Sequence, residues 1–65
     1  MSEELYELSA RILLEIESMQ NRLNFALSLA RQLEDQKFID ELTITQKQLS
    51  AARETLMTKM RSAAA

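Results

Sequence analysis

The stretch Glu34-Asp35-Gln36-Lys37-Phe38-Ile39-Asp40-Glu41 decides how this chain folds, because the apolar pattern before it does not continue after it. Before it, two rows repeat every seven residues, four positions apart, which is typical of a helix packed lengthwise against another helix. The first row is Leu5, Ile12, Met19, Ala26 and Leu33, and the second is Ser9, Ile16, Leu23 and Ala30. Continuing these rows would place Lys37 and Asp40 in the seam, so we expect the first helix to end here.

A new heptad pattern follows the break. Its rows are Leu42, Leu49 and Leu56, with Phe38, Thr45 and Ala52 beside them. The sequence therefore predicts an all-α antiparallel two-helix hairpin forming one unit over residues 1–65. We expect helices over 3–34 and 39–61, a turn at about 35–39, and a frayed or appended tail over 62–65. The alternative is one continuous helix about 95 Å long that dimerises as a coiled coil.

Composition and charge favour the hairpin. The chain contains no Gly and no Pro, and good helix formers dominate it. Residues 1–20 carry a net charge of −4 and residues 42–65 carry +3, so folding back brings opposite charges together. We expect the seam to pair two sets of residues: Ile12, Ile16, Met19, Leu23, Ala26 and Ala30 with Leu42, Leu49, Ala52 and Leu56.

The small size predicts association with another chain. A unit of 65 residues buries only about 60% of its unfolded surface. The sequence has no Cys for a disulfide and neither Cys nor His for a structural zinc site. We therefore expect the hairpin to complete a bundle with a partner chain or with copies of itself.

Three apolar side chains point away from the expected seam and predict a partner-binding face. Leu14, Phe25 and Leu29 follow one another by eleven and four residues, which places them on one line of the first helix. Leu8 lies at the seam's edge and serves either surface. The alternative is that these are scattered apolar residues of an ordinary surface.

No pattern of catalytic, metal-binding or cofactor-binding residues is present in the sequence, so we expect neither an enzyme nor a cofactor. Acidic residues dominate the first twenty, which argues against a signal peptide, and charges interrupt every long window, which argues against a membrane span. An interfacial helix carries Lys and Arg on its polar face, whereas acids flank the apolar run Ile12-Leu13-Leu14 here. We expect a cytoplasmic protein without a small-molecule substrate.

Nucleic acid is a weaker candidate partner. Antiparallel hairpins that dimerise into four-helix bundles bind RNA in the Rop-type plasmid regulators. Here the net charge is −2 and the basic residues form no single stripe. A self-associating, Rop-like hairpin acting as a structural or RNA-binding regulator is the alternative function.

Two segments carry a family resemblance. Residues 20–33, QNRLNFALSLARQL, and residues 46–54, QKQLSAARE, are separated by a polar break. Over residues 20–54 the chain resembles the small E-component co-chaperones of type III secretion needle subunits. The resemblance rests on Leu23, Ala26, Leu27 and Leu33 and on the Gln-rich second segment. It implies a cytoplasmic subunit that pairs with a larger helical-repeat chaperone and helps to keep the needle protein soluble before export.

Overall fold

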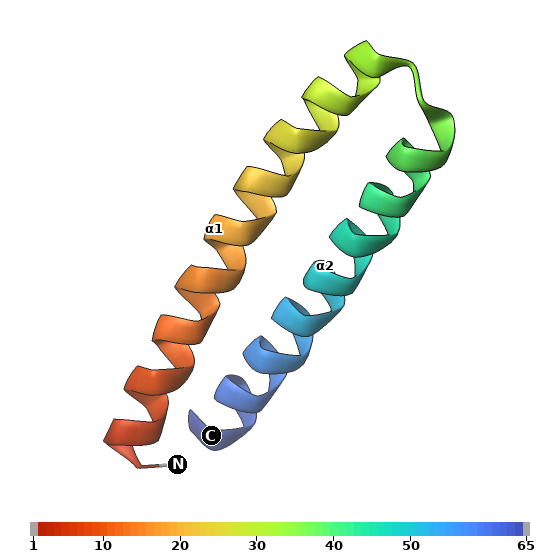
Figure 1. The fold of residues 1–65 in the computed structure, drawn as a ribbon. Coiled ribbons are helices and arrows are strands. Elements are labelled where there is room, and N and C mark those ends of the chain that lie inside the picture. Colours follow the sequence, from red (N-terminus) through yellow and green to blue (C-terminus); the bar gives the residue numbers. More distant parts are fainter. Residues whose placement is uncertain (1, 65) are drawn as a thin grey trace.

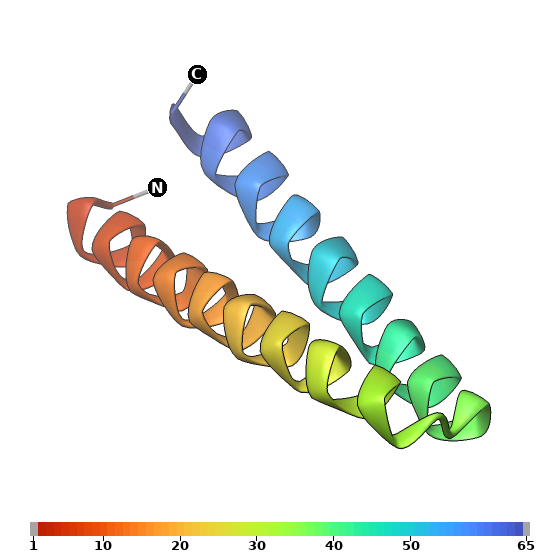
Figure 2. The ribbon, with the colours of Figure 1, turned by 90° about the horizontal axis from the view of Figure 1, so that it is seen from above.

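The chain is a hairpin of two antiparallel helices. The structure, a computed structural model, describes residues 2–64 and contains α1 (Glu3–Leu33, 31 residues) and α2 (Gln36–Ala64, 29 residues). The helices run antiparallel, with the start of α1 and the end of α2 opposite the turn (Figure 1), and Figure 2 shows from above that they diverge from the turn toward that open end. The predicted all-α helical hairpin is confirmed, and the single continuous helix is wrong.

The first helix begins where the sequence supplies a cap. The Ser2 hydroxyl accepts a hydrogen bond from the Leu5 backbone N–H at 3.2 Å, which satisfies one of the free donors at the helix start. Glu3 and Glu4 occupy the first turn, where negative charge stabilises the helix dipole, and Arg31 lies in the last turn.

The turn is shorter than predicted and lies earlier in the chain. Glu34 adopts the left-handed conformation (φ 58°, ψ 28°), and its N–H bonds the Arg31 carbonyl at 3.2 Å, which ends α1. The Asp35 carboxylate then accepts the Phe38 N–H at 3.2 Å and caps α2. The turn is therefore Glu34 and Asp35 rather than 35–39, because Asp35 already caps the second helix, which begins at Gln36.

The predicted tail also needs correction over most of its length. Residues 62–64 belong to α2, which continues through Ala64. Good helix formers and the absence of a stop signal such as Gly or Pro explain this continuation. Ala65 lies outside the described residues.

Half of the predicted seam is correct and half is rotated by one residue. Of the predicted rows, Ile16 and Ala30 are buried and Leu23 is half-buried. Ile12 and Met19, in contrast, are 52% and 42% exposed. The second row of the α1 seam instead follows these residues by one position, and consists of Leu13, Gln20 and Leu27.

Helix α2 shows the same rotation. The predicted row of Leu42, Leu49 and Leu56 is half-buried, but Phe38, Thr45 and Ala52 are exposed. The second row of the α2 seam lies one position after the predicted second row, and consists of Ile39, Gln46, Arg53 and Met60. The corrected rows include polar residues, which fit the seam because they pair with polar side chains of the other helix.

One seam gives this molecule a small core and a large surface. Among the side chains that the structure describes, residues 2–63, only Ile16, Leu27 and Ala30 are buried. The Cα radius of gyration is 15.0 Å, against about 11 Å for a compact domain of this length. Neither helix, over the part of the chain that the structure describes, offers an apolar window long enough to cross a bilayer.

Candidate protein-binding surface

The exposed apolar side chains of the hairpin are concentrated on α1. Among the described residues, eleven large hydrophobic side chains remain exposed; nine belong to α1, and Phe38 and Ile44 belong to α2. The surface of a soluble monomer tolerates single apolar residues, but large clusters of them usually mark a binding site. Most of the exposed apolar surface of the described residues therefore lies on α1.

The sequence-predicted binding residues are all exposed, but they do not form one compact patch. Leu14 and Phe25 are 66% and 67% exposed, and Leu29 and Leu8 about half. Phe25 lies opposite the seam, with Leu29 one turn further on and Leu14 eleven residues earlier, about 16 Å along the axis. We call Leu14, Phe25 and Leu29 the outer face, and Leu8 lies at its border.

A second exposed apolar surface lies beside the seam, although the heptad pattern predicted its residues inside the seam. It is the heptad row that lies one position before the second row of the α1 seam. We call this row the lateral face, and it consists of Leu5, Ile12, Met19, Ala26 and Leu33. Ala26 is half-buried and the other four are exposed.

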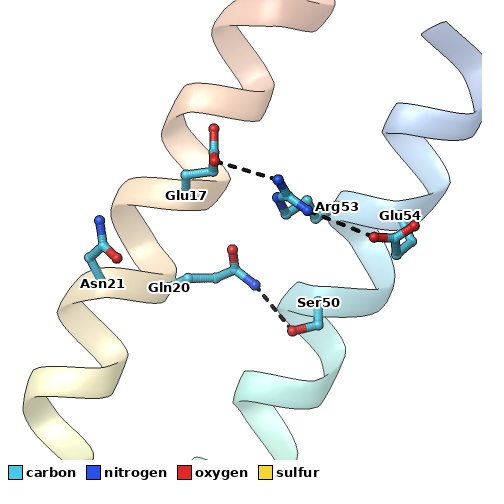
Figure 3. A pocket seen from close by; sticks show the side chains of 6 residues that line it. All are labelled: Glu17, Gln20, Asn21, Ser50, Arg53 and Glu54. Carbon is cyan, nitrogen blue, oxygen red and sulfur yellow. Dashed lines mark hydrogen bonds and ion pairs between the residues drawn. The ribbon is translucent and has the colours of Figure 1, made fainter. Parts of the chain in front are cut away.

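The opposite edge of the seam is polar. A shallow groove there is lined from both helices, and we call it the polar groove; its residues are Glu17, Gln20, Asn21, Ser50, Arg53 and Glu54. Figure 3 shows Gln20 reaching across to Ser50, with Arg53 between Glu17 and Glu54. The Gln20 amide donates to the Ser50 hydroxyl at 3.1 Å. Arg53 lies 3.6 Å from the Glu17 carboxylate and 3.7 Å from that of Glu54.

These cross-helix contacts explain how polar residues occupy the seam. Gln20, Gln46 and Arg53 sit at heptad positions where a two-helix seam usually carries apolar side chains. Each reaches sideways to a partner on the other helix: Gln20 bonds Ser50, Gln46 donates to Asn24, and Arg53 pairs with Glu17. The residue numbers total 70 in each of the three pairs, so all three report the same alignment of α1 against α2.

The polar groove presents carboxylate, amide, hydroxyl and guanidinium groups. The chain has no His or Cys to serve as a nucleophile or base near neutral pH. Within residues 2–64, acidic side chains form no cluster suited to a metal ion. At the open end of the hairpin a further shallow depression is mainly apolar, lined by Tyr6, Leu13, Met57, Met60 and Arg61.

One feature of the sequence indicates that the lateral face is a second packing surface. On each helix the first row of the seam is buried or half-buried, and two neighbouring heptad rows are candidates for its second row. Leu13, Gln20 and Leu27 are less uniformly apolar than Ile12, Met19 and Ala26, so apolarity alone favoured the wrong row. The presence of two competing apolar rows is itself a signal, because a helix that packs against two neighbours carries a wider apolar stripe than a helix in a single pair.

Comparison of the chain with family models, with curated proteins and with solved structures found no match. The fold and surface thus define a class, an all-α antiparallel helical hairpin with unpartnered apolar faces on one helix.

Proposed function

We propose that this hairpin is a non-catalytic protein-binding module, and that the outer face of α1 binds a larger helical chaperone subunit in the cytoplasm. The observation that carries the proposal is the concentration of exposed apolar side chains on α1. A helix of 31 residues presents a straight surface about 46 Å long, which suits a groove between the helices of a partner. Phe25 is the expected anchor, because buried aromatic residues commonly dominate binding energy.

The resemblance over residues 20–54 supports a particular partner class. In the E-component co-chaperones of type III secretion, a small hairpin pairs with a helical-repeat chaperone that holds the needle subunit soluble before export. The small core and free apolar surface of this chain agree with a subunit that gains stability from such a partner. The proposed role is therefore that of a co-chaperone subunit.

Co-expression with candidate helical-repeat chaperones encoded near the gene, each with and without its needle subunit, tests the proposal. We expect a soluble complex with one of them, whose affinity falls roughly 30-fold or more with Phe25→Ala, as expected for loss of about 2 kcal/mol at an interface anchor. Ile44→Ala is the matched control, because Ile44 is an exposed apolar residue of α2. Equal affinities for Phe25→Ala and the wild type would exclude the outer face as the binding surface.

A second candidate function is a self-associating hairpin that acts as a structural or RNA-binding regulator. The lateral face favours self-association, because its apolar side chains recur every seven residues along α1. The net charge of −2 disfavours the RNA-binding form of this function. Titration of the purified chain with structured RNA at low salt distinguishes the two forms, since RNA binding requires an affinity that falls steeply as salt rises.

A further inference from the structure

The lateral face has the pattern of a second helix-packing seam. Its residues recur every seven positions, and a neighbouring row three residues on adds Leu8, Glu15, Arg22 and Leu29. These two rows together lie about 100° around α1 from the seam with α2. A helix with two apolar stripes at roughly a right angle is typical of a four-helix bundle, where each helix packs against two neighbours.

Helix α2 extends this surface. The groove residues Glu17 and Ser50 each follow a seam residue by one position, and they meet across one edge of the seam. In an antiparallel pair the residues that precede a seam residue meet at the other edge. On α2 the row that precedes Ile39, Gln46, Arg53 and Met60 consists of Phe38, Thr45, Ala52 and Lys59, so it continues the lateral face of α1. The hairpin is therefore polar on one side and mainly apolar on the other.

We propose that a second copy of this chain covers the lateral face, with α1 antiparallel to the partner's α1 and a two-fold axis beside Met19. The lateral face is symmetric about this residue, because Leu5 and Leu33 lie fourteen positions to either side and Ile12 and Ala26 lie seven. Reversing one copy thus sets the large Ile12 opposite the small Ala26 of the other. The same alignment overlaps the two hairpins over their whole length, since Met19 lies near the middle of α1.

Charge selects the antiparallel arrangement over the parallel one. Glu15 and Arg22, both exposed, interrupt the row of Leu8 and Leu29. In a parallel pair each would face its own copy, and like charges placed directly opposite destabilise a helix pair. In the antiparallel pair centred beside Met19, Glu15 of one copy lies near Arg22 of the other, twice by symmetry. The two residues thus contribute to orientation rather than to affinity.

The exposed area matches what such a dimer needs. The chain exposes 5097 Å², whereas a monomeric protein of 7.5 kDa typically exposes about 4,200 Å². The excess is roughly 850 Å², and a stable interface buries about 800 Å² of each partner. Covering the lateral face would thus bring the exposed area to an ordinary value.

The dimer goes beyond the proposed function and is compatible with it. Leu14 and Phe25 lie outside both rows of the lateral face, with Phe25 about 80° around α1 from its centre, and remain free for a heterologous partner. Only Leu8 and Leu29 lie at the border of both surfaces. Loss of self-association and loss of partner binding therefore require different substitutions.

Cysteine cross-linking of the full chain tests the proposal cleanly, because the sequence contains no Cys. In the antiparallel dimer a Met19→Cys thiol lies beside its own copy. We expect it to form a disulfide-linked dimer about tenfold or more faster than Phe25→Cys, owing to the millimolar effective concentration of paired sites. Leu5→Cys should not link to itself, because the two copies of residue 5 would lie about 40 Å apart. It should link when mixed with Leu33→Cys.

Two results would overturn the proposal. Efficient self-linking of Leu5→Cys would show a parallel arrangement, and equal rates for Met19→Cys and Phe25→Cys would show random collision. Met19 and Leu5 are exposed in the single hairpin, and circular dichroism of each variant verifies that helicity is retained.

Discussion

Glu34 is the residue on which the turn depends. It is the one non-Gly residue with positive φ among residues 2–64, and it closes α1 without the glycine that usually occupies such a position. A side chain with a Cβ atom pays roughly 1–2 kcal/mol in the left-handed region. The turn is thus held by its flanking hydrogen bonds and by the packing of the two helices rather than by the preference of Glu34.

Glu34→Gly should therefore stabilise the hairpin. We expect a gain of about 1 kcal/mol, since the relief of left-handed strain exceeds the added chain entropy of glycine. Urea unfolding followed by circular dichroism measures the change. Gln32→Gly is the control, because Gln32 lies in regular helix and should lose about 1 kcal/mol. A loss of stability for Glu34→Gly would contradict the left-handed conformation.

The sequence predicted a break but not its position for the same physical reason. Because the chain contains no glycine, nothing in it marks the left-handed residue, and Glu34 is one of several polar residues in the stretch. Asp35 as a helix cap was within reach of sequence reasoning, since Asp is a preferred N-cap residue. Lys37 and Asp40 suggested a longer polar turn, yet both lie on the exposed surface of α2.

Within each helix, the register of the seam was only partly predictable. Leucine and isoleucine rows identified Ile16, Leu23, Leu42 and Leu49 as seam residues, and all four are buried or half-buried. The second row was not predictable from apolarity, because it contains Gln20, Gln46 and Arg53. Their side chains fit in the seam because each pairs with a polar side chain at the edge of the other helix. These pairs can be identified only when the alignment of the two helices is known.

Leu27 provides a direct test of the corrected register. It is 3% exposed, so Leu27→Ala should destabilise the hairpin by about 2–5 kcal/mol through lost burial and an unfilled cavity. Leu14→Ala is the matched control on the same helix, where 66% exposure limits the expected change to about 0.5 kcal/mol. Chemical unfolding of both variants measures the difference. Similar losses for the two would mean that α1 is rotated differently against α2.

For the whole molecule, the prediction of fold class is confirmed, and the assignment of a partner-binding surface stays a prediction. The broken heptad pattern and the charge difference between the halves were enough to predict a hairpin. The outer face was proposed from Phe25 and its neighbours, which are exposed. The lateral face was missed because Ile12 and Met19 look like residues of the intramolecular seam. Helical spacing predicts that such residues pack, but it does not state whether they pack against the same chain or another.

The two free faces make the single hairpin incomplete as a folding unit. Its few buried side chains oppose a conformational entropy cost of about 1.5 kcal/mol per ordered residue, so little net stability remains for the isolated hairpin. Burial of the lateral face against a second copy adds apolar contact without any change of fold. The stability of the chain should therefore depend on its association.

Sedimentation equilibrium of the purified chain tests this central claim most directly. At roughly 100 µM, above the micromolar Kd common for interfaces of this size, we expect a mass twice the chain's 7.5 kDa. Met19→Glu should shift the population to the single-chain mass by burying unpaired charges at the two-fold axis, while Phe25→Glu should not. A wild-type chain that sediments at 7.5 kDa, indistinguishable from Met19→Glu, would contradict the account.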